Sequence, residues 1–296
     1  MYTKMRRTNA KSTWTALAVC LLFVLLMAAL FLYLGDREEP QTPLPADDGI
    51  TVHFIDVGQG DCAIVQTPDG NLLIDAGTPD SAQAIRRYAD ALGITEFAYA
   101  IFTHPHADHI GSAAALLEAY QFDRVILPNA VSTSKTFEHL LDALEKENCE
   151  MIEGKAGVGL TLGKLKIDLL APVGAYEDLN DMSVVALLTY DGGKFLFTGD
   201  AEAVSEADIL KTASPDCDVL KVGHHGSSTS SSEAFLTAAS PEIAVISVGE
   251  GNSYGHPHAS IVKRLETCGA EIYRTDLCGS VVVSFDGENY TVTTEK

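Results

Sequence analysis

The stretch "THPHADH" at residues 103–109 places three of the chain's nine histidines and one aspartate within seven positions. It follows the apolar run "FAYAIF" (97–102) and precedes "IGSAAALLEAY" (110–120), which has helical spacing. Loops between a strand and a helix often hold the functional side chains of α/β proteins. Imidazole and carboxylate groups are ligands for zinc, manganese or iron, so this loop predicts a metal site, with spacing that suits two adjacent ions.

Two further segments end an apolar run in a candidate ligand. "FLFTGDAE" (195–202) leads into Asp200, and "LKVGHHGSS" (220–228) leads into the adjacent His224 and His225. An aspartate after a strand is often only a helix cap. A vicinal histidine pair on a glycine-rich loop is seldom core packing, and we therefore expect the three segments to meet in one site.

The hydrophobic pattern after residue 50 predicts short strands that alternate with helices. "SVVALLTYDGGKFLFTGD" (183–200) has the turn residues of a β-hairpin, and "TFEHLLDALEKEN" (136–148) has the spacing of an amphipathic helix. In that helix we expect Leu140, Leu141 and Leu144 to face inward. The alternation favours two mixed sheets packed together with helices outside.

The first 49 residues differ in character from the rest. Residues 1–13 are basic, and residues 14–34 are uncharged over a length that spans a bilayer core of about 30 Å. The run is too long for a signal-peptide core, so we predict an uncleaved transmembrane signal anchor with residues 1–13 in the cytoplasm. The proline-rich and acidic residues 35–49 predict an exposed linker to a domain at 50–296.

The charge balance limits what the chain can bind. It has 20 Lys and Arg against 41 Asp and Glu, and its first 35 residues hold four of the basic residues and none of the acidic ones. The remainder therefore has a formal net charge of −25, which repels polyanions. A nucleic-acid substrate must be held by a local site, by metal or by a partner.

Six motifs together resemble those of the metallo-β-lactamase-fold hydrolases, and most closely the hydrolase domain of the ComEC/Rec2 competence proteins. The motifs are "HFIDVGQGD" (53–61), "LLIDAG" (72–77), "THPHADHIGS" (103–112), "FLFTGDAE" (195–202), "LKVGHHGSSTSSS" (220–232) and "NSYGHPH" (252–258). The resemblance covers residues 50–296. It implies an α/β fold, a four-layer αββα sandwich, with two divalent metal ions, zinc or manganese, at the edge between the two sheets.

The resemblance also implies a metal ligand at each matching position: His104, His106, Asp108, His109, Asp200 and one of His224 and His225. His104 and His106 would bind the first ion. Asp108 and His109 would bind the second ion, with Asp200 as the bridge. One histidine of the 224/225 pair would complete the second site, and the sequence leaves open which one. Asp75 would support the site from behind the ligands.

The candidate catalytic residues are Asp108, His225 and His256. Water between two divalent ions loses much of its proton affinity, and the resulting hydroxide would attack phosphorus in line. Asp108 would orient the nucleophile. The spare histidine of the pair, with His256 or His258, would donate to the phosphate or protonate the leaving oxygen.

The chain departs from many relatives at one position. They supply another histidine between the first cluster and the bridging aspartate, whereas here only His139 lies between residues 110 and 199, in an amphipathic helix where we expect it at the surface. "DLNDMS" (178–183) occupies the corresponding region. The first ion would therefore have fewer protein ligands, and Asn180 or Ser183 would contact substrate instead.

"DVGQGD" (56–61) has no catalytic spacing of its own. Its two glycines permit a tight turn close to the site, so we interpret it first as a structural turn and second as a substrate contact through Asp61. His53, in the strand before this turn, is expected to be structural.

The expected function is that of a membrane-anchored, extracytoplasmic phosphodiesterase, with DNA as the substrate that the resemblance implies. Two alternatives stay open: hydrolysis of a choline-phosphate ester or another small or wall phosphodiester, and a non-enzymatic, metal-stabilised surface module that binds a partner. Asp200 and His224 lie only 24 positions apart. That spacing leaves no room for the inserted clamp domain of RNA-processing relatives, so RNA maturation is not expected.

Overall fold

The structure is a computed structural model that describes residues 49–147 and 149–296. The predicted cytoplasmic tail, transmembrane anchor and all but the last residue of the predicted linker lie outside the described residues. Within the described ranges, no helix is long and apolar enough to cross a membrane.

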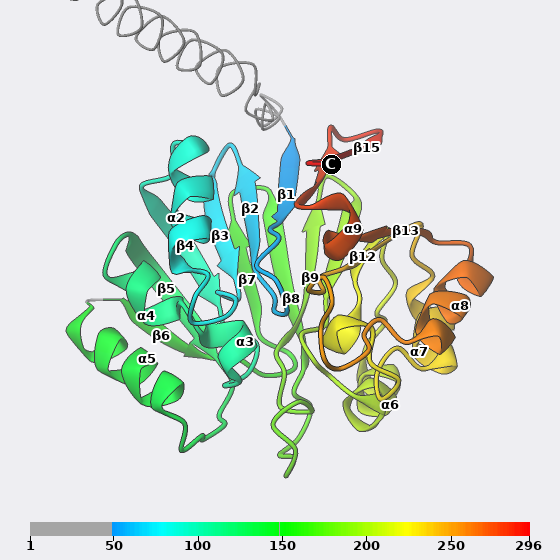
Figure 1. Cartoon of the computed structure of the whole chain (residues 1–296), viewed down its shortest axis with the longest axis horizontal. Coiled ribbons are helices and arrows are strands. Elements are labelled where there is room, and N and C mark those ends of the chain that lie inside the picture. Colours follow the sequence, from blue (N-terminus) through cyan, green and yellow to red (C-terminus); the bar gives the residue numbers. More distant parts are fainter. Residues whose placement is uncertain (1–48, 148) are drawn as a thin grey trace, which may run out of the picture. The chain divides into compact units, whose positions relative to one another are not determined.

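Two mixed β-sheets form the inner layers of the domain (Figure 1). The first sheet contains β1 (Ile50–Phe54), β2 (Ala63–Thr67), β3 (Gly70–Ile74), β4 (Glu96–Ile101), β5 (Gln121–Leu127), β6 (Glu150–Glu153), β14 (Val281–Phe285) and β15 (Tyr290–Thr294). The second sheet contains β7 (Gly159–Leu162), β8 (Leu165–Ala171), β9 (Val185–Tyr190), β10 (Gly193–Phe197), β11 (Val219–Lys221), β12 (Ile243–Ile246) and β13 (Glu271–Arg274).

Each sheet is antiparallel on one side and parallel on the other. The order in the first sheet is β15-β14-β1-β2-β3-β4-β5-β6, and the pairs from β3 to β6 are parallel. The order in the second sheet is β13-β12-β11-β10-β9-β8-β7, and the pairs from β10 to β13 are parallel. Parallel strands place their carboxyl ends at one edge, which is where α/β folds commonly bind ligands.

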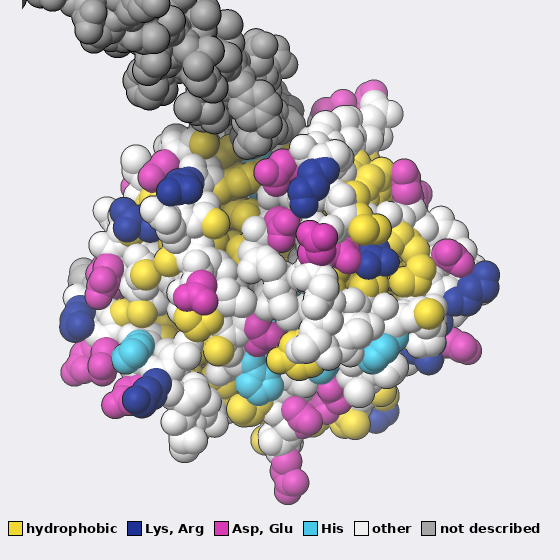
Figure 2. Space-filling model, viewed as in Figure 1, with side chains coloured by type: hydrophobic (Ala, Val, Ile, Leu, Met, Phe, Trp, Pro, Cys, Tyr) yellow, Lys and Arg dark blue, Asp and Glu magenta, His cyan; other side chains and the backbone are white. Residues whose placement is uncertain are grey.

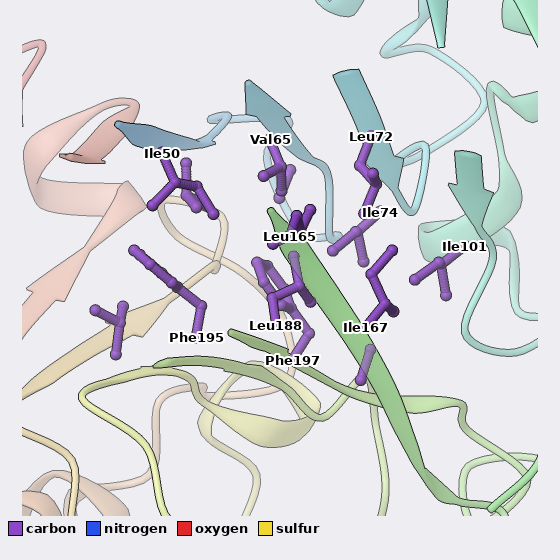
Figure 3. Packing of buried hydrophobic residues seen from close by; sticks show 14 of the residues in the cluster. Ile50, Val65, Leu72, Ile74, Ile101, Leu165, Ile167, Leu188, Phe195 and Phe197 are labelled. Carbon is purple, nitrogen blue, oxygen red and sulfur yellow. The ribbon is translucent and has the colours of Figure 1, made fainter. Parts of the chain in front are cut away.

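The main core lies between the two sheets (Figure 3). Strand β8 illustrates the cause, because Leu165 and Ile167 are buried while Lys166 and Asp168 between them are exposed. This two-residue alternation sends one face of the strand inward, where it meets β-branched and aromatic side chains of the opposite sheet. Removal of this apolar surface from water is the largest favourable contribution to folding.

Helices cover the outer faces of both sheets, which gives the four-layer αββα arrangement that the sequence predicts (Figure 1). The first sheet carries α2 (Ala82–Ala91), α4 (Ala113–Leu117) and α5 (Lys135–Lys146), and the second carries α6 (Ala203–Thr212), α7 (Glu233–Ala239) and α8 (Ala259–Cys268). Two short helices, α3 (Ala107–Ile110) and α9 (Thr275–Cys278), lie in connections.

Two local predictions were wrong. Helix α5 buries Leu140 and Leu144, but Leu141 is 45% exposed because adjacent residues on a helix point about 100° apart. The single helix expected at 110–120 is instead two short helices, α3 and α4. The interruption coincides with Gly111, where a Cβ would lie 2.2 Å from the backbone carbon of Thr78, so the chain packs tightly against a neighbouring loop at this point.

Candidate metal centre

The loops that follow β3, β4, β10 and β11 meet at one edge of the sandwich. They place Asp75, the 104–109 loop, Asp200 and the vicinal histidines next to one another, as the strand-end positions of these residues predict. Figure 2 shows histidine side chains at the surface near this edge, with acidic groups around them. The three sequence segments therefore form one cluster.

Asp200 lies at the centre of the cluster and is almost completely buried. Its Oδ1 is 3.1 Å from His109 Nε2 and 3.9 Å from His225 Nε2. Its Oδ2 is 3.8 Å from His104 Nε2 and 3.6 Å from His224 Nε2. The two carboxylate oxygens thus face two different sets of imidazoles, which is the geometry of a bridging ligand.

Four residues, Asp108, His109, Asp200 and His225, form what we call the inner half of the site. Each offers one ligand atom, and these atoms all lie within 4.8 Å of one another. His109 Nε2, Asp200 Oδ1 and His225 Nε2 are buried, yet none of them makes a hydrogen bond within the part of the chain that the structure describes. Buried polar atoms normally have partners, so this donor set fits a divalent cation.

The opposite ring nitrogens of the buried histidines are held in place. His109 Nδ1 donates to Asp75 Oδ2 at 2.8 Å, and His225 Nδ1 donates to the carbonyl oxygen of Ser247 at 3.0 Å. Asp75 also accepts two hydrogen bonds of 2.7 Å from Thr103, through the backbone and the hydroxyl. Such contacts fix the ring orientation and leave Nε2 free for a metal, as in known metal sites.

The vicinal histidines share an unusual backbone conformation but differ in exposure. His224 and His225 have φ angles of 50° and 53°, in the left-handed region that non-glycine residues rarely adopt. His225 is 1% exposed, whereas the side chain of His224 is 22% exposed. Strained backbone of this kind is often retained at functional sites.

The outer half of the site consists of His104, His106 and Asp200, with His224 nearby. His104 Nε2 is 3.0 Å from His106 Nδ1, and Ser183 Oγ lies 3.3 Å from His104 Nδ1. Ser183 also accepts a hydrogen bond from the backbone N–H of Asp200 at 3.1 Å and is completely buried. Its position is that of a brace behind the ligands, not of a residue that contacts substrate.

Asp61 has a more central place than the sequence indicated. Its Oδ2 forms an ion pair with Lys221 Nζ at 2.6 Å, and its Oδ1 lies 3.2 Å from His225 Nδ1. Lys221, which the sequence reasoning did not single out, is 3% exposed and also donates to the carbonyl oxygen of Val222 at 2.9 Å. The sequence did offer one indication of this pair: Lys221 lies within the apolar run of β11, and a buried ammonium requires an acidic partner.

The turn that carries Asp61 is packed directly against the metal loop. The backbone N–H of Asp61 donates to the carbonyl oxygen of Asp108 at 3.0 Å. A Cβ at Gly60 would lie 2.5 Å from that same oxygen, so only glycine allows this approach. The structural role predicted for the turn is therefore confirmed, and the turn also supports the inner half.

Charge interactions within the buried cluster shift several pKa values. Burial lowers the pKa of His225, but the carboxylates of Asp200 and Asp61 raise it more, to about 9. Burial raises the pKa of Asp61, but Lys221 and His225 lower it more, to about 2. Burial, together with the charge of His109, lowers the pKa of His104, so this ring is neutral and able to bind a cation.

The remaining predicted histidines occupy distinct positions. The His256 ring lies 5.7 Å from His224 and 6.5 Å from His225, so it is beside the cluster. His258 Nδ1 accepts from the backbone N–H of Ser228 at 2.9 Å, which gives it a structural contact. His53 is buried between Gln66 and Tyr88, as expected of a structural residue, and His139 is exposed on α5.

Comparison with known proteins identifies the class. Residues 55–250 match the model of the metallo-beta-lactamase superfamily, and the chain belongs to this family of metal-dependent hydrolases. The solved structure of YhfI from Bacillus subtilis, described as a metallo-beta-lactamase fold protein, covers 80% of this chain and 100% of its own length with a TM-score of 0.56 at 15% identity.

The curated relatives that the chain matches are competence proteins of the ComEC/Rec2 type. ComE operon protein 3 of Bacillus subtilis is 31% identical over 250 residues, which are 78% of this chain and 32% of that protein. Competence protein ComA of Neisseria gonorrhoeae is 30% identical over 277 residues, 90% of this chain and 38% of that protein. The chain therefore spans about a third of the length of these relatives.

Proposed function

We propose that this chain is a two-metal phosphodiesterase that acts on DNA. The observation that carries the proposal is the inner half of the site, a buried cluster in which the Nε2 atoms of His109 and His225 make no hydrogen bond within the described residues and lie 3.1 and 3.9 Å from Asp200 Oδ1. The relation to a "recombination" protein and to two competence proteins supports DNA as the substrate class.

We assign the residues as follows. Asp108, His109 and His225 would hold one ion, His104 and His106 would hold the other, and Asp200 would serve both. The ions, zinc or manganese, lower the pKa of water and stabilise negative charge on a phosphate when they are bound. The proposal takes His225 as the metal ligand of the vicinal pair. Its support is that His225 is buried with Nε2 near Asp200, while His224 remains accessible.

The accessible residues would act on the substrate. The side chain of Asp108 is 34% exposed, so it can both bind metal and orient the attacking oxygen nucleophile. His256 has its pKa lowered to about 4, by burial and by the nearby His224 and His225, and is therefore neutral at pH 7. A neutral imidazole can donate a hydrogen bond to a phosphate oxygen, and we assign that role to His256 together with His224.

The acidity of the domain favours a small phosphodiester as the second candidate. Figure 2 shows acidic groups spread over the visible face without a continuous patch of Lys and Arg. Tight binding along a nucleic-acid backbone normally requires such a patch. A choline-phosphate ester or another wall phosphodiester places no such demand on the surface.

One assay separates the candidates. The full-length chain, loaded with Mn²⁺, is tested on single-stranded DNA and on p-nitrophenyl phosphorylcholine, with Asp200→Asn as the inactive control. Preference for DNA supports the proposal, and preference for the choline ester selects the second candidate. Metal binding without hydrolysis of either substrate would favour the non-enzymatic module.

We further propose that residues 14–34 anchor the chain in the cell membrane with the hydrolase domain outside the cytoplasm. The support is the uncharged length of this segment and the basic residues before it. Protease added to intact spheroplasts should digest the domain. Without protease, the full-length chain should stay in the membrane fraction after a wash with alkaline carbonate. Protection of the domain in intact spheroplasts would contradict this orientation.

A further inference from the structure

We infer that Tyr254 forms a subsite that stacks on an unpaired nucleobase of the substrate. The ring of His256 lies between Tyr254 and the metal centre. The inference rests on the proposed phosphodiesterase function and specifies its substrate as single-stranded nucleic acid. It starts from the position of Tyr254 on the loop between β12 and α8, in the segment "NSYGHPH".

Tyr254 is 66% exposed, and it is the only aromatic residue among the large hydrophobic side chains exposed in the described ranges. Its ring lies 5.7 Å from the His256 ring at an interplanar angle of 26°. One face of the tyrosine is therefore directed toward His256 in a roughly parallel arrangement. An aromatic ring that is held on one side and open to solvent on the other suits stacking with a planar partner.

The loop that presents the two rings is built rigidly. Asn252 Oδ1 accepts hydrogen bonds from the backbone N–H groups of Tyr254, at 3.2 Å, and of His256, at 3.0 Å. The Asn252 amide donates to the carbonyl oxygens of Gly249, at 3.0 Å, and of His256, at 2.6 Å. Because the Asn252 side chain bonds to both ends of the turn, the backbone that carries Tyr254 is held in place before substrate arrives.

The loop is also tied to the metal centre. Gln59, two positions before Asp61, accepts a hydrogen bond from the backbone N–H of Gly249 at 3.1 Å. On the inner side, the His256 ring lies 5.7 Å from His224. A chain of ring contacts thus runs from Tyr254 through His256 to the metal cluster, so a phosphate at the cluster would place a neighbouring base near Tyr254.

Stacking also answers the problem of charge. The acidic domain cannot hold a nucleic acid by attraction along the backbone, whereas stacking on an aromatic ring is independent of charge and of base identity. Bases inside a duplex are already stacked on their neighbours, so the subsite selects single strands or frayed ends.

The test compares Tyr254→Ala with Tyr254→Phe in the full-length chain. Binding of a fluorescent phosphorothioate oligothymidylate, which resists hydrolysis, is measured with Mn²⁺ present, next to an abasic phosphorothioate oligonucleotide of equal length. Leu277→Ala, a truncation of another exposed apolar side chain that is 64% exposed on α9, is the matched control.

We expect Tyr254→Ala to weaken oligothymidylate binding about 5- to 150-fold, the range for loss of one stacked base, and Tyr254→Phe to retain it. Abasic DNA should bind weakly and respond to neither substitution. The inference is overturned if Tyr254→Ala weakens both ligands equally, if it weakens neither, or if the wild-type chain does not distinguish them.

A parallel hydrolysis assay with Mn²⁺ keeps the two claims separate. If wild type and Tyr254→Ala both hydrolyse DNA and prefer oligothymidylate over abasic DNA to the same degree, the subsite is overturned and the proposed function stands. Base-dependent binding through Tyr254 without any hydrolysis by the wild-type chain overturns the proposed function and supports the subsite.

Discussion

The inner and outer halves of the site share Asp200 but differ in how they are supported. In the inner half, His109 and His225 are buried and each is held by a fixed acceptor, Asp75 or the carbonyl oxygen of Ser247. In the outer half, His106 is only partly buried, and the hydroxyl of the buried Ser183 lies beside His104. From this contrast we expect the inner half to bind its ion more tightly than the outer half, where His106 is more exposed.

The largest expected effect comes from the residue that both halves use. Asp200→Asn removes one charged oxygen from the bridge, so we expect hydrolysis to fall on the order of 10³-fold or more. His106→Ala should also abolish detectable activity while the domain still folds. Activity is measured with the preferred phosphodiester, and folding by circular dichroism. A double variant, His106→Ala with Asp200→Asn, that hydrolyses substrate at the wild-type rate would contradict the site assignment.

The vicinal histidines allow the two halves to be compared directly. His225→Ala should remove the tightly held ion, because His225 Nε2 belongs to the inner cluster, whereas His224→Ala should retain it. The measurement is the metal content of each variant after dialysis against a weak chelator. If His224→Ala lost the tight ion and His225→Ala kept it, the roles of the pair would be reversed.

Support behind the inner half is tested at Lys221. Lys221→Met leaves the carboxylate of Asp61 buried without its ammonium partner, so we expect a loss of about 3–5 kcal/mol of unfolding free energy. Affinity for the inner ion should fall about 10- to 100-fold, because Asp61 contacts His225. Urea denaturation with EDTA and metal titration measure the two effects.

The matched control for Lys221 is the double variant Lys221→Met with Asp61→Asn. It removes both charges, so it should recover part of the lost stability but none of the lost metal affinity. Equal stability of wild type and Lys221→Met would show that the pair does not stabilise this region.

The smallest expected effect is on the pH dependence of the unfolding free energy. It comes from His53, which is buried in the fold and is not one of the proposed metal ligands. Burial lowers the pKa of His53 from its ordinary value of 6.5 to about 4. Below pH 6.5 the unfolded chain takes up a proton that the folded chain does not, so stability falls as pH decreases toward 4. We expect a loss of about 2 kcal/mol between pH 7 and pH 5 from this residue.

Urea denaturation of wild type and His53→Gln at both pH values, with EDTA present, measures this term. EDTA removes the contribution of bound metal, and the histidines of the site are common to both proteins. The wild type should lose about 2 kcal/mol more than the variant on acidification. If both proteins lost the same unfolding free energy, His53 would not be the cause of the pH dependence.

The sequence predicted the fold and the convergence of the ligands because both follow from local patterns. Asp200 and His224 stand just past apolar runs, and strand ends of a parallel sheet meet at one edge. The sequence did not indicate that His225 is buried and His224 accessible, nor that both residues have left-handed backbone angles, because no local pattern reports either feature. The Asp61–Lys221 pair joins positions 160 apart in the chain, so only the packing of the two sheets reveals it.

The most direct test of the two-metal assignment is anomalous diffraction from crystals of the protein soaked in Mn²⁺. The account predicts a strong peak about 2.0–2.3 Å from His225 Nε2, with Asp108, His109 and Asp200 as its other ligands, and a weaker peak beside His104 and His106. A full-occupancy peak at His104 and His106 with none among Asp108, His109 and His225 would contradict it.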